Sequence, residues 1–272
     1  MPVLAVIPAR LGATRLPRKP LRLLGGVPLV VRVHERVVQL GVADLCVVAT
    51  DDTEVLDTCS RFGIPAILTD ADHPSGTDRV AEVAALSAYQ SFDVILNVQG
   101  DEPFVSEQAL RGAVGVVLAG HAPIGTAAVP VDRTALDRRD VVKVVCDDEG
   151  LALYFSRAPI PCLREDSEST LRDGLLRQHV GVYAYTRAAL AQWVAWPPHP
   201  LERVERLEQL RPLAHGLRIG VAECAAAEAG IDTEDDLVRA NQFWTEHQHT
   251  YDAAVIPAPL PQSLSTSSLG NA

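Results

Sequence analysis

The segment Val3-Leu-Ala-Val-Ile-Pro-Ala-Arg-Leu-Gly-Ala-Thr-Arg-Leu-Pro-Arg-Lys-Pro-Leu21 joins a short apolar run to a loop rich in basic side chains. The run Val3–Pro8 is continuously apolar, which is typical of a strand covered on both faces. The loop after it carries four basic residues: Arg10, Arg15, Arg18 and Lys19. Because open α/β sheets bind ligands at the carboxyl ends of their strands, we expect this loop to bind an anion such as a triphosphate.

Working outward from this segment, strand-like and helix-like patterns alternate through the first half of the chain. We expect strands at Val3–Pro8, Leu45–Thr50, Ile64–Leu68, Val94–Val98 and Gly125–Val131. We expect helices at Pro28–Leu40, Thr53–Phe62, Gly76–Tyr89 and Ser106–Ala119. Strands that alternate with helices predict an α/β fold with a mostly parallel, doubly wound sheet.

The second half is less regular. Strands are expected at Val141–Cys146, Ala152–Phe155 and Val180–Tyr185, with a polar loop at Arg164–Gly174 that is a candidate subdomain or dimer surface. A helical segment at Leu201–Leu213, a strand at Arg218–Ala222 and a helix at Thr233–His247 follow. We therefore expect one domain over residues 1–247, with a smaller subdomain at about 140–215. Residues 248–272 are rich in Pro, Ser, Thr and Ala and are expected to form a disordered tail.

Composition limits the class of function. The chain has 272 residues and a net charge of −11, which argues against a general nucleic-acid binder. No apolar run reaches the ~18 residues of a membrane span, and no secretory signal pattern opens the sequence. The five cysteines show no metal-ligand spacing. We expect a cytoplasmic enzyme or binding protein for small anions.

Lysine is rare in this chain. Of 24 basic residues, only Lys19 and Lys143 are lysines. A compact ammonium at Lys19, among arginines, suits a phosphate better than a fixed planar group would. The loop matches neither the dinucleotide-binding nor the P-loop glycine pattern, so those two classes of nucleotide site are disfavoured.

Acidic residues follow another expected strand. In Asn97-Val-Gln-Gly-Asp-Glu-Pro103, Asp101 and Glu102 emerge at the same sheet edge as the basic loop, and Gly100 permits close backbone approach. A carboxylate beside phosphates is best explained by Mg²⁺, which takes one or two carboxylates together with phosphate oxygens. The alternative is a turn acid that helps to start the next helix.

Two further segments are ambiguous. In Gly230–Leu237, Thr233 and Asp236 resemble a capping box, which leaves Asp232 free to bind a metal. In Asp72–Arg79, a basic residue in the first turn of a helix is unfavourable for the helix dipole and weakly indicates a binding role.

The remaining polar residues have ordinary explanations. Arg157 and His179 lie in expected strands, where such residues more often have a structural role. The acidic residues Glu202, Glu205 and Glu208 are spaced like a solvated helix face with ion pairs. No nucleophile–histidine signature of a hydrolase is present.

Taken together, these motifs resemble one enzyme family in order and content. The chain is similar to the 3-deoxy-manno-octulosonate cytidylyltransferases (CMP-Kdo synthetases) from about residue 3 to residue 247. The resemblance rests on Ile7-Pro-Ala-Arg10, Thr14-Arg-Leu-Pro17 with Lys19-Pro-Leu21, His73 with Ser75-Gly-Thr-Asp-Arg79, Asn97-Val-Gln-Gly-Asp-Glu-Pro103, Val142-Lys-Val-Val145, Tyr154-Phe-Ser-Arg157 and Leu207-Glu-Gln-Leu-Arg211.

The resemblance implies a Rossmann-like, three-layer nucleotidyltransferase fold of the glycosyltransferase-A type and a homodimer. It implies that CTP and 3-deoxy-D-manno-octulosonate (Kdo) react to give CMP-Kdo and pyrophosphate, for lipopolysaccharide biosynthesis. The anomeric 2-hydroxyl of Kdo would attack the α-phosphorus, and positioning and charge neutralisation would supply most of the catalysis. Mg²⁺, rather than a side-chain base, would activate that hydroxyl.

The same resemblance assigns roles to residues. Arg10, Arg15 and Lys19 would hold the triphosphate, while Arg79 and the backbone near Ala9 would face the cytidine. Asp101 and Asp232 would bind Mg²⁺ and, with Arg10 and Lys19, form the catalytic set. The ulosonate pocket would be lined by Gln99, Arg157, His179, Tyr183, Glu208 and Gln209, with Arg157 a partner for the sugar carboxylate.

This sequence departs from the family pattern at three positions. Ala13 stands where Ser is usual, Arg18 where Gly is usual, and Gln178 where Arg is common. A cytidylyltransferase for another ulosonate, such as amino-Kdo or sialic acid, is the nearest alternative. A non-catalytic nucleotide-binding protein is disfavoured, because Lys19, Asp101 and Asp232 are all present.

Overall fold

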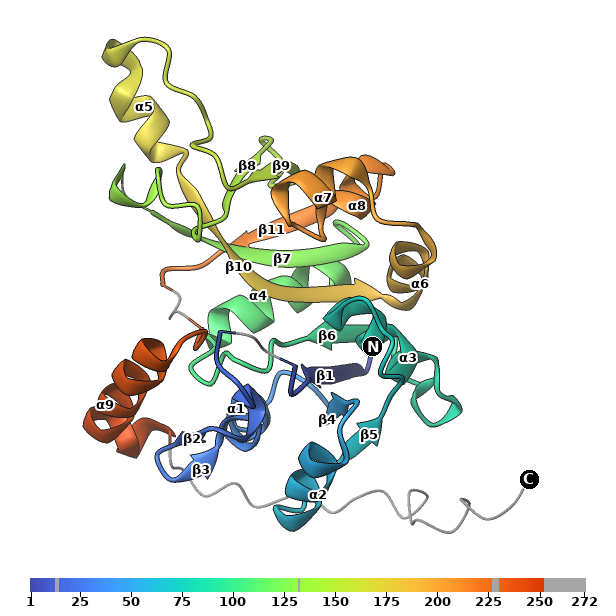
Figure 1. Cartoon of the computed structure of the whole chain (residues 1–272). Coiled ribbons are helices and arrows are strands. Elements are labelled where there is room, and N and C mark those ends of the chain that lie inside the picture. The colour runs from blue at the N-terminus through green and yellow to red at the C-terminus, as the bar shows by residue number, and fades with distance from the viewer. Residues whose placement is uncertain (13–14, 132, 227–229, 252–272) are drawn as a thin grey trace.

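A mixed sheet covered by helices on both faces forms the protein (Figure 1). The computed structural model describes residues 1–12, 15–131, 133–226 and 230–251. The strands are β1 (Val3–Ala9), β2 (Leu23–Leu24), β3 (Val27–Pro28), β4 (Leu45–Thr50), β5 (Ala66–Leu68), β6 (Val94–Asn97), β7 (Ile124–Pro130), β8 (Lys143–Cys146), β9 (Ala152–Ser156), β10 (Arg177–Thr186) and β11 (Ile219–Glu223). The α-helices are α1 (Leu29–Leu40), α2 (Thr53–Arg61), α3 (Gly76–Ala85), α4 (Glu107–Leu118), α5 (Ser169–Gly174), α6 (Arg187–Ala195), α7 (Pro200–Glu205), α8 (Leu210–Ala214) and α9 (Glu234–Tyr251).

The strand order of the main sheet is β11-β7-β10-β6-β1-β4-β5. Strands β1, β4, β5 and β6 pair in parallel, as do β7 and β11. Strand β10 runs antiparallel between β6 and β7, so the sheet is mixed at its centre. The prediction of a mostly parallel α/β sheet is confirmed, and the two reversed strands, β9 and β10, are an addition to it.

Strand β1 shows why the sheet needs cover on both sides. Ala5 and Ile7 belong to one core cluster, which they share with α1, α4 and α9, whereas Leu4 and Val6 belong to the other, which they share with α3 and α6. Successive side chains of a strand point to opposite faces. A continuous apolar run therefore produces a three-layer structure with two cores.

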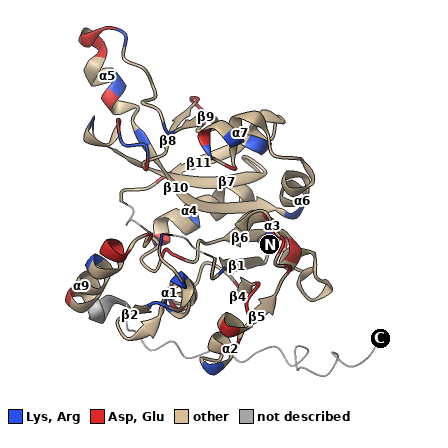
Figure 2. Ribbon diagram, in the orientation of Figure 1, with Lys and Arg blue, Asp and Glu red and all other residues tan. Residues whose placement is uncertain are grey.

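A second lobe grows from β10. Strands β8 and β9 form a hairpin that pairs with β10, and Figure 1 shows α5 at the end of an extension that projects beyond them. The expected polar loop at 164–174 thus contains a short helix, which is a correction. The ribbon of α5 is coloured for both acidic and basic residues in Figure 2. Since β10 belongs to the main sheet, the segment 140–215 is continuous with it, and its role in dimerisation stays a prediction.

Two helices differ from expectation. Helix α6 was not predicted from the sequence, although Thr186 is a typical N-cap residue. Its hydroxyl accepts a hydrogen bond from the Ala189 amide and so caps the first turn of α6. Helix α9 continues to Tyr251 beyond a break at His247, so the first four residues of the expected tail are ordered. Residues 252–272 lie outside the described part. Among the described helices, none is long and apolar enough to cross a bilayer.

Candidate active site

A cavity of 440 Å³ lies where β1 and β6 end. Its walls come from the basic loop, the N-terminus of α3, the turn after β6 and Asp232 in the segment before α9. All five residues expected to contact a nucleotide line it: Ala9, Arg10, Arg15, Lys19 and Arg79. Both residues expected to bind a metal, Asp101 and Asp232, line it as well. The structure thus brings together residues that are more than 200 positions apart in sequence.

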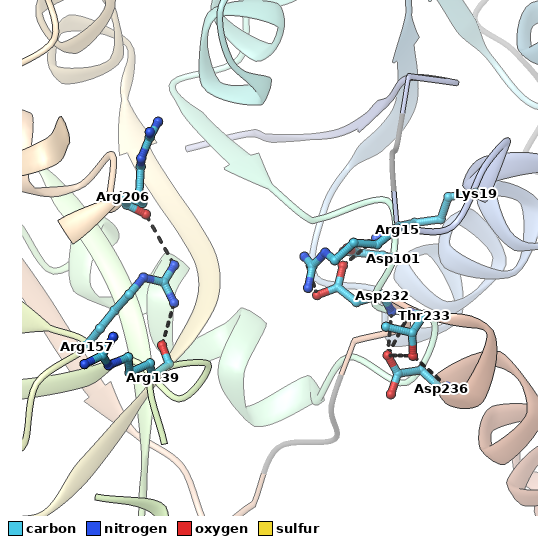
Figure 3. A network of polar contacts seen from close by, with 9 residues as sticks. All are labelled: Arg15, Lys19, Asp101, Arg139, Arg157, Arg206, Asp232, Thr233 and Asp236. Carbon is cyan, nitrogen blue, oxygen red and sulfur yellow. Dashed lines mark hydrogen bonds and ion pairs between the residues drawn. The ribbon is translucent and has the colours of Figure 1, made fainter. Parts of the chain in front are cut away.

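Lys19 is the centre of the polar network in this first cavity (Figure 3). Its Nζ donates to Asp101 Oδ2 at 2.7 Å and to Asp232 Oδ1 at 2.8 Å. Arg15 Nη2 donates to the other oxygen of Asp232 at 3.0 Å. Burial lowers the pKa of Lys19, but the two carboxylates outweigh it and the pKa is raised. The ammonium therefore stays charged and holds the two carboxylates around one position.

The local backbone explains why Asp101 and Asp232 converge. Ile231 donates its amide to the Asp101 carbonyl at 2.9 Å, which fixes the start of the α9 segment against the turn after β6. Thr233 and Asp236 form the expected reciprocal cap, with the Thr233 amide 2.8 Å from Asp236 Oδ2. Because Asp236 serves that cap, Asp232 is free to face Lys19. The capping-box prediction is confirmed.

Gly100 fulfils the expectation of close backbone approach. A Cβ at this position would lie 2.7 Å from the Pro8 carbonyl oxygen. Only glycine therefore lets the turn after β6 press against the end of β1, which brings Asp101 next to the basic loop. The backbone that Gly100 contacts closely is therefore that of β1.

Glu102 follows Asp101 but has different electrostatics. Burial, with the added negative charges of Asp101 and Asp232, raises the pKa of Glu102 to about 8. At neutral pH this side chain is therefore largely protonated. The negative charge available to a cation here comes from Asp101 and Asp232.

The basic loop does not use all of its charges in the first cavity. Arg10 and Arg15 are exposed residues that line it. Arg18 instead pairs with Glu54 on α2 and lines a separate hollow beside that helix. Of the four basic residues in the loop that we expected to bind an anion, Arg18 therefore does not line the first cavity. Its φ of 58° is left-handed, the conformation that favours the glycine usual there. Ala13 lies outside the described residues.

Arg79 lines the first cavity but is tied to neighbouring groups. It is 3% exposed, and its Nη2 donates to Asp51 Oδ2 at 2.8 Å. Its Nη1 donates to the Thr69 hydroxyl and to the Asp70 carbonyl. The ion pair with Asp51 explains a basic residue in the first turn of α3, so that position is no longer a clue to binding. Ser75 caps α3, because its hydroxyl accepts a hydrogen bond from the Asp78 amide.

A second cavity of 350 Å³ adjoins the first. The six residues expected to form a sugar pocket all line it: Gln99, Arg157, His179, Tyr183, Glu208 and Gln209. Gln99, Glu208 and Gly76 line both cavities. A ligand in the second cavity therefore meets a ligand in the first across these shared residues.

Arg157 is held firmly by backbone oxygens. Its Nε donates to the Glu205 carbonyl at 2.9 Å, its Nη1 to the Arg139 carbonyl at 2.8 Å and its Nη2 to the Arg206 carbonyl at 3.3 Å (Figure 3). An arginine has five N–H donors, so some remain for a carboxylate. All three partners are backbone carbonyls, so none of these guanidinium contacts is an ion pair.

His179 is neutral in this environment. Burial lowers its pKa to about 3. Its Nε2 lies 3.0 Å from Thr126 Oγ1, whose own hydroxyl is 2.7 Å from the Val182 carbonyl. A carbonyl can only accept, so the Thr126 proton goes to Val182 and Nε2 must carry the imidazole hydrogen. That tautomer leaves Nδ1 as an acceptor.

The acidic residues after α6 do not form a solvated stripe, which corrects the sequence interpretation. Glu202 is buried in an ion pair with Arg211, at 2.6 Å. Glu205 accepts from the Ser156 hydroxyl at 2.6 Å and the Arg157 amide at 2.9 Å. Glu208 accepts from Thr77 at 2.9 Å, and burial raises its pKa. The chain turns at Arg206, where φ is 55°, so one helical stripe never forms.

Sequence reasoning missed four polar residues of the second cavity: Thr77, Asn97, Trp193 and Arg206. Asn97 was quoted only as part of its motif, and Trp193 lies on the helix that was omitted. Recognising α6 from its cap and its apolar spacing would have placed Trp193 on a buried face.

The comparisons with known proteins agree with this geometry. The cytidylyltransferase family model matches residues 4–219. A 3-deoxy-manno-octulosonate cytidylyltransferase of Gemmatimonas aurantiaca is 73% identical over 90% of this chain and 95% of its own length. Relatives of the same name from Polynucleobacter asymbioticus and Wolinella succinogenes are 47% and 44% identical, over 88% and 86% of this chain and 94% and 96% of their own lengths. The chain belongs to the 3-deoxy-manno-octulosonate cytidylyltransferase family.

Solved structures extend the likeness to three dimensions. The structure of CMP:2-keto-3-deoxy-manno-octonic acid synthetase with CTP has a TM-score of 0.84 at 35% identity, over 91% of this cytidylyltransferase and 100% of that chain. A 4-diphosphocytidyl-2C-methyl-D-erythritol synthase from Anaerococcus prevotii shares the fold, with a TM-score of 0.56 at 15% identity, over 90% of this chain and 98% of that one. The predicted nucleotidyltransferase fold is confirmed.

Proposed function

We propose that this protein is a 3-deoxy-manno-octulosonate cytidylyltransferase, which converts CTP and Kdo into CMP-Kdo and pyrophosphate. The observation that carries the proposal is the pair of adjoining cavities. The first is lined by the basic loop and the two aspartates, the second by Arg157 and His179, and Gln99 and Glu208 line both. A nucleotide and a sugar acid bound in these cavities would meet at that boundary.

In the nucleotide half, Arg10, Arg15 and Lys19 supply positive charge for the triphosphate. Their arrangement suits several phosphate oxygens, because the arginines are exposed while Lys19 lies deeper, with 14% of its side chain exposed. Lys19 would exchange its carboxylate partners for phosphate oxygens when CTP binds. Arg79, fixed by Asp51, would shape the wall near the cytidine.

Mg²⁺ is proposed as the cofactor, because the donor set suits it. One ammonium reaches both Asp101 and Asp232, so their oxygens already face a common cation position. Within the described residues, no cluster of three or more His, Cys, Asp or Glu side chains forms a complete metal site. Two carboxylates completed by phosphate oxygens are a typical Mg²⁺ environment. When bound, Mg²⁺ would neutralise phosphate charge and favour ionisation of the attacking hydroxyl.

The sugar half would position the nucleophile. The Arg157 guanidinium would bind the sugar carboxylate, and the neutral His179 offers an acceptor at Nδ1. The 2-hydroxyl oxygen forms a bond to the α-phosphorus while the bond from that phosphorus to the pyrophosphate oxygen breaks. Alignment of the two substrates, rather than covalent participation of a side chain, would supply the catalysis.

The first test is pyrophosphate release from CTP and Mg²⁺ with Kdo, amino-Kdo, sialic acid or no sugar. We expect release with Kdo. Release only with another ulosonate would keep the nucleotide half and overturn the sugar assignment. A lack of pyrophosphate release with every sugar would favour a non-catalytic nucleotide-binding protein. Cytoplasmic location, a homodimer and a place in lipopolysaccharide biosynthesis remain part of the proposal, each to be tested in cells or by light scattering.

A further inference from the structure

One wall of the second cavity is a single turn of the chain, residues 206–209, which we call the wall turn. Its four residues, Arg206, Leu207, Glu208 and Gln209, all line this cavity. The wall turn joins α7 to α8, two helices of six and five residues that lie side by side (Figure 1). Helices this short have little stability of their own, so contacts between side chains have to hold the turn in place.

A buried ion pair joins the helices on either side of the wall turn. Arg211, on α8, donates from Nε to Glu202 Oε2 at 2.8 Å and from Nη2 to Glu202 Oε1 at 2.6 Å. Only 4% of the Arg211 side chain and 11% of the Glu202 side chain are exposed. Glu202, on α7, also accepts from the His199 amide at 3.1 Å. Two parallel hydrogen bonds fix the angle as well as the distance between the helices.

The wall turn is also attached to the chain at the end of β9. Arg157 follows β9 and donates to the carbonyls of Glu205 and Arg206. The Glu205 carboxylate in turn accepts from the Ser156 hydroxyl and the Arg157 amide. These contacts place the start of the turn against β9, whereas the ion pair sets how α7 and α8 meet.

The ion pair is better suited to positioning the turn than to stabilising the fold. Leu207 and Leu210 already anchor this region, at 5% and 1% exposure, in the core shared with α3 and α6. Two charges lose hydration on burial, and apolar side chains of similar volume often stabilise a protein as well as a buried ion pair does. Apolar side chains, however, can pack in several arrangements, whereas a two-bonded ion pair has one geometry.

We propose that Glu202 and Arg211 are positioning residues for the reaction: their ion pair holds the wall turn, and with it Glu208 and Gln209, in place beside the ligands. This inference deepens the proposed function, on which it rests. Neither Glu202 nor Arg211 lines either cavity, so both act through the wall turn. Of the four wall-turn residues, Glu208 alone also lines the first cavity, so the sugar site should depend on the ion pair more than the nucleotide site does.

The double variant Glu202→Leu with Arg211→Met tests the proposal. It replaces both charges by apolar side chains of similar size and leaves no buried charge alone. The His199 amide and the Trp196 carbonyl also lose a partner, but both residues are partly exposed and water can replace it. We expect a thermal unfolding midpoint near that of wild type, a KM for Kdo raised about tenfold and a KM for CTP near wild type.

Hydrogen exchange shows whether the wall turn itself has moved. The amides of Leu207 and Arg211 donate to the carbonyls of Glu202 and Glu208 at 3.2 and 3.0 Å, so an ordered turn protects them. Without substrate, these amides should exchange about tenfold faster in the double variant, while those of β6 and β10 keep the wild-type rate.

Two further variants complete the experiment. Arg203→Met is the matched control, because it changes an exposed side chain of α7 and keeps the ion pair; exchange and both KM values should stay as in wild type. Arg211→Lys keeps the charge but not the two-bonded geometry, so it should raise the KM for Kdo as the double variant does. It also supplies the answer if the double variant does not fold.

The proposal requires both faster exchange in the wall turn and a higher KM for Kdo. If the KM for Kdo does not change, the ion pair serves the fold alone and the proposal is overturned. If that KM rises while exchange in the wall turn does not, the effect does not pass through the turn, and the proposal is again wrong. Exchange is measured without substrate, so wild type that releases no pyrophosphate with any sugar would count against the proposed function, while exchange still decides whether the ion pair holds the turn.

Discussion

Lys19 Nζ lies 2.7 Å from Asp101 Oδ2 and 2.8 Å from Asp232 Oδ1, so an ammonium lies where the proposed function requires a divalent cation. Lys19 and a metal therefore compete for the same carboxylates. When CTP binds, its phosphates offer Lys19 other anionic partners and leave the aspartates to the metal. Metal and nucleotide should for this reason bind cooperatively.

Lys19→Met should strengthen metal binding in the absence of nucleotide. Removing the competing ammonium leaves the two carboxylates unneutralised, and we expect the affinity for Mn²⁺ to rise about tenfold by electron paramagnetic resonance titration. The same variant should lose most of its turnover, because the triphosphate loses a partner.

The matched control for this prediction is Asp235→Asn, an exposed acid one turn from the site. It should bind Mn²⁺ as wild type does. Adding Asp101→Asn to Lys19→Met should abolish the gain. If Lys19→Met binds Mn²⁺ no better than wild type, Lys19 and the metal do not compete for the two carboxylates.

Arg18→Gly should change neither the stability of the fold nor the KM for CTP by much. The change relieves a left-handed φ of 58°, worth about 1 kcal/mol, and removes an exposed ion pair with Glu54, worth up to about 1 kcal/mol. Urea unfolding should give a free energy of unfolding within about 1 kcal/mol of wild type. The KM for CTP should stay unchanged, whereas Arg15→Ala should raise it. A large change in that KM for Arg18→Gly would mean that Arg18 contacts the nucleotide.

His179 should make the fold sensitive to acid. Its pKa is lowered from 6.5 to about 3 in the folded protein, so the unfolded chain binds a proton that the folded chain refuses. Stability from this group is complete above pH 6.5 and is lost as the pH falls toward 3. Between pH 7 and 5, His179→Gln should therefore lose less stability than wild type, by on the order of 1 kcal/mol.

Urea unfolding at both pH values measures this difference. His199→Gln is the control, because His199 precedes α7 as its N-cap and is only partly buried, whereas His179 lies in β10 beside the second cavity. Equal acid sensitivity in wild type and His179→Gln would contradict the assignment of a neutral, buried imidazole.

Lys143 joins three backbone segments beside the second cavity through hydrogen bonds to their carbonyls. It is fully buried, and its Nζ donates to the carbonyls of Arg138, Val141 and Arg157 at 3.0, 2.8 and 2.7 Å. Lys143→Met removes a buried donor from all three carbonyls, of which only that of Arg138 has another described donor, the Val141 amide, and it should lower the free energy of unfolding by about 2–4 kcal/mol. Because one carbonyl belongs to Arg157, the KM for Kdo should also rise while that for CTP does not.

Arg138→Met changes an exposed side chain in the same loop and keeps its backbone carbonyl, so it is the control for Lys143→Met. It should leave stability and both KM values near wild type. A uniform rise of both KM values in Lys143→Met would assign Lys143 to stability alone.

Local patterns predicted much of the fold and site. Continuous apolar runs predicted the buried strands, and the Thr233–Asp236 spacing predicted the cap that frees Asp232. Every residue that the motif resemblance assigned to the nucleotide lines the first cavity, and every residue that it assigned to the sugar lines the second. The prediction of one solvated helix face failed for Glu202, Glu205 and Glu208. Their spacing fits a continuous helix, but the left-handed backbone at Arg206 interrupts that helix.

The sequence by itself determined the α/β class, the order of the strands along the chain and the residue types that surround the site, because these depend on local periodicity and short motifs. Only the tertiary structure decided that Lys19 lies between Asp101 and Asp232, that Arg18 turns away to Glu54, and that Gln99 and Glu208 line both cavities. Those relationships join residues distant in sequence, and they arise from the packing of strands and helices, which no local pattern records.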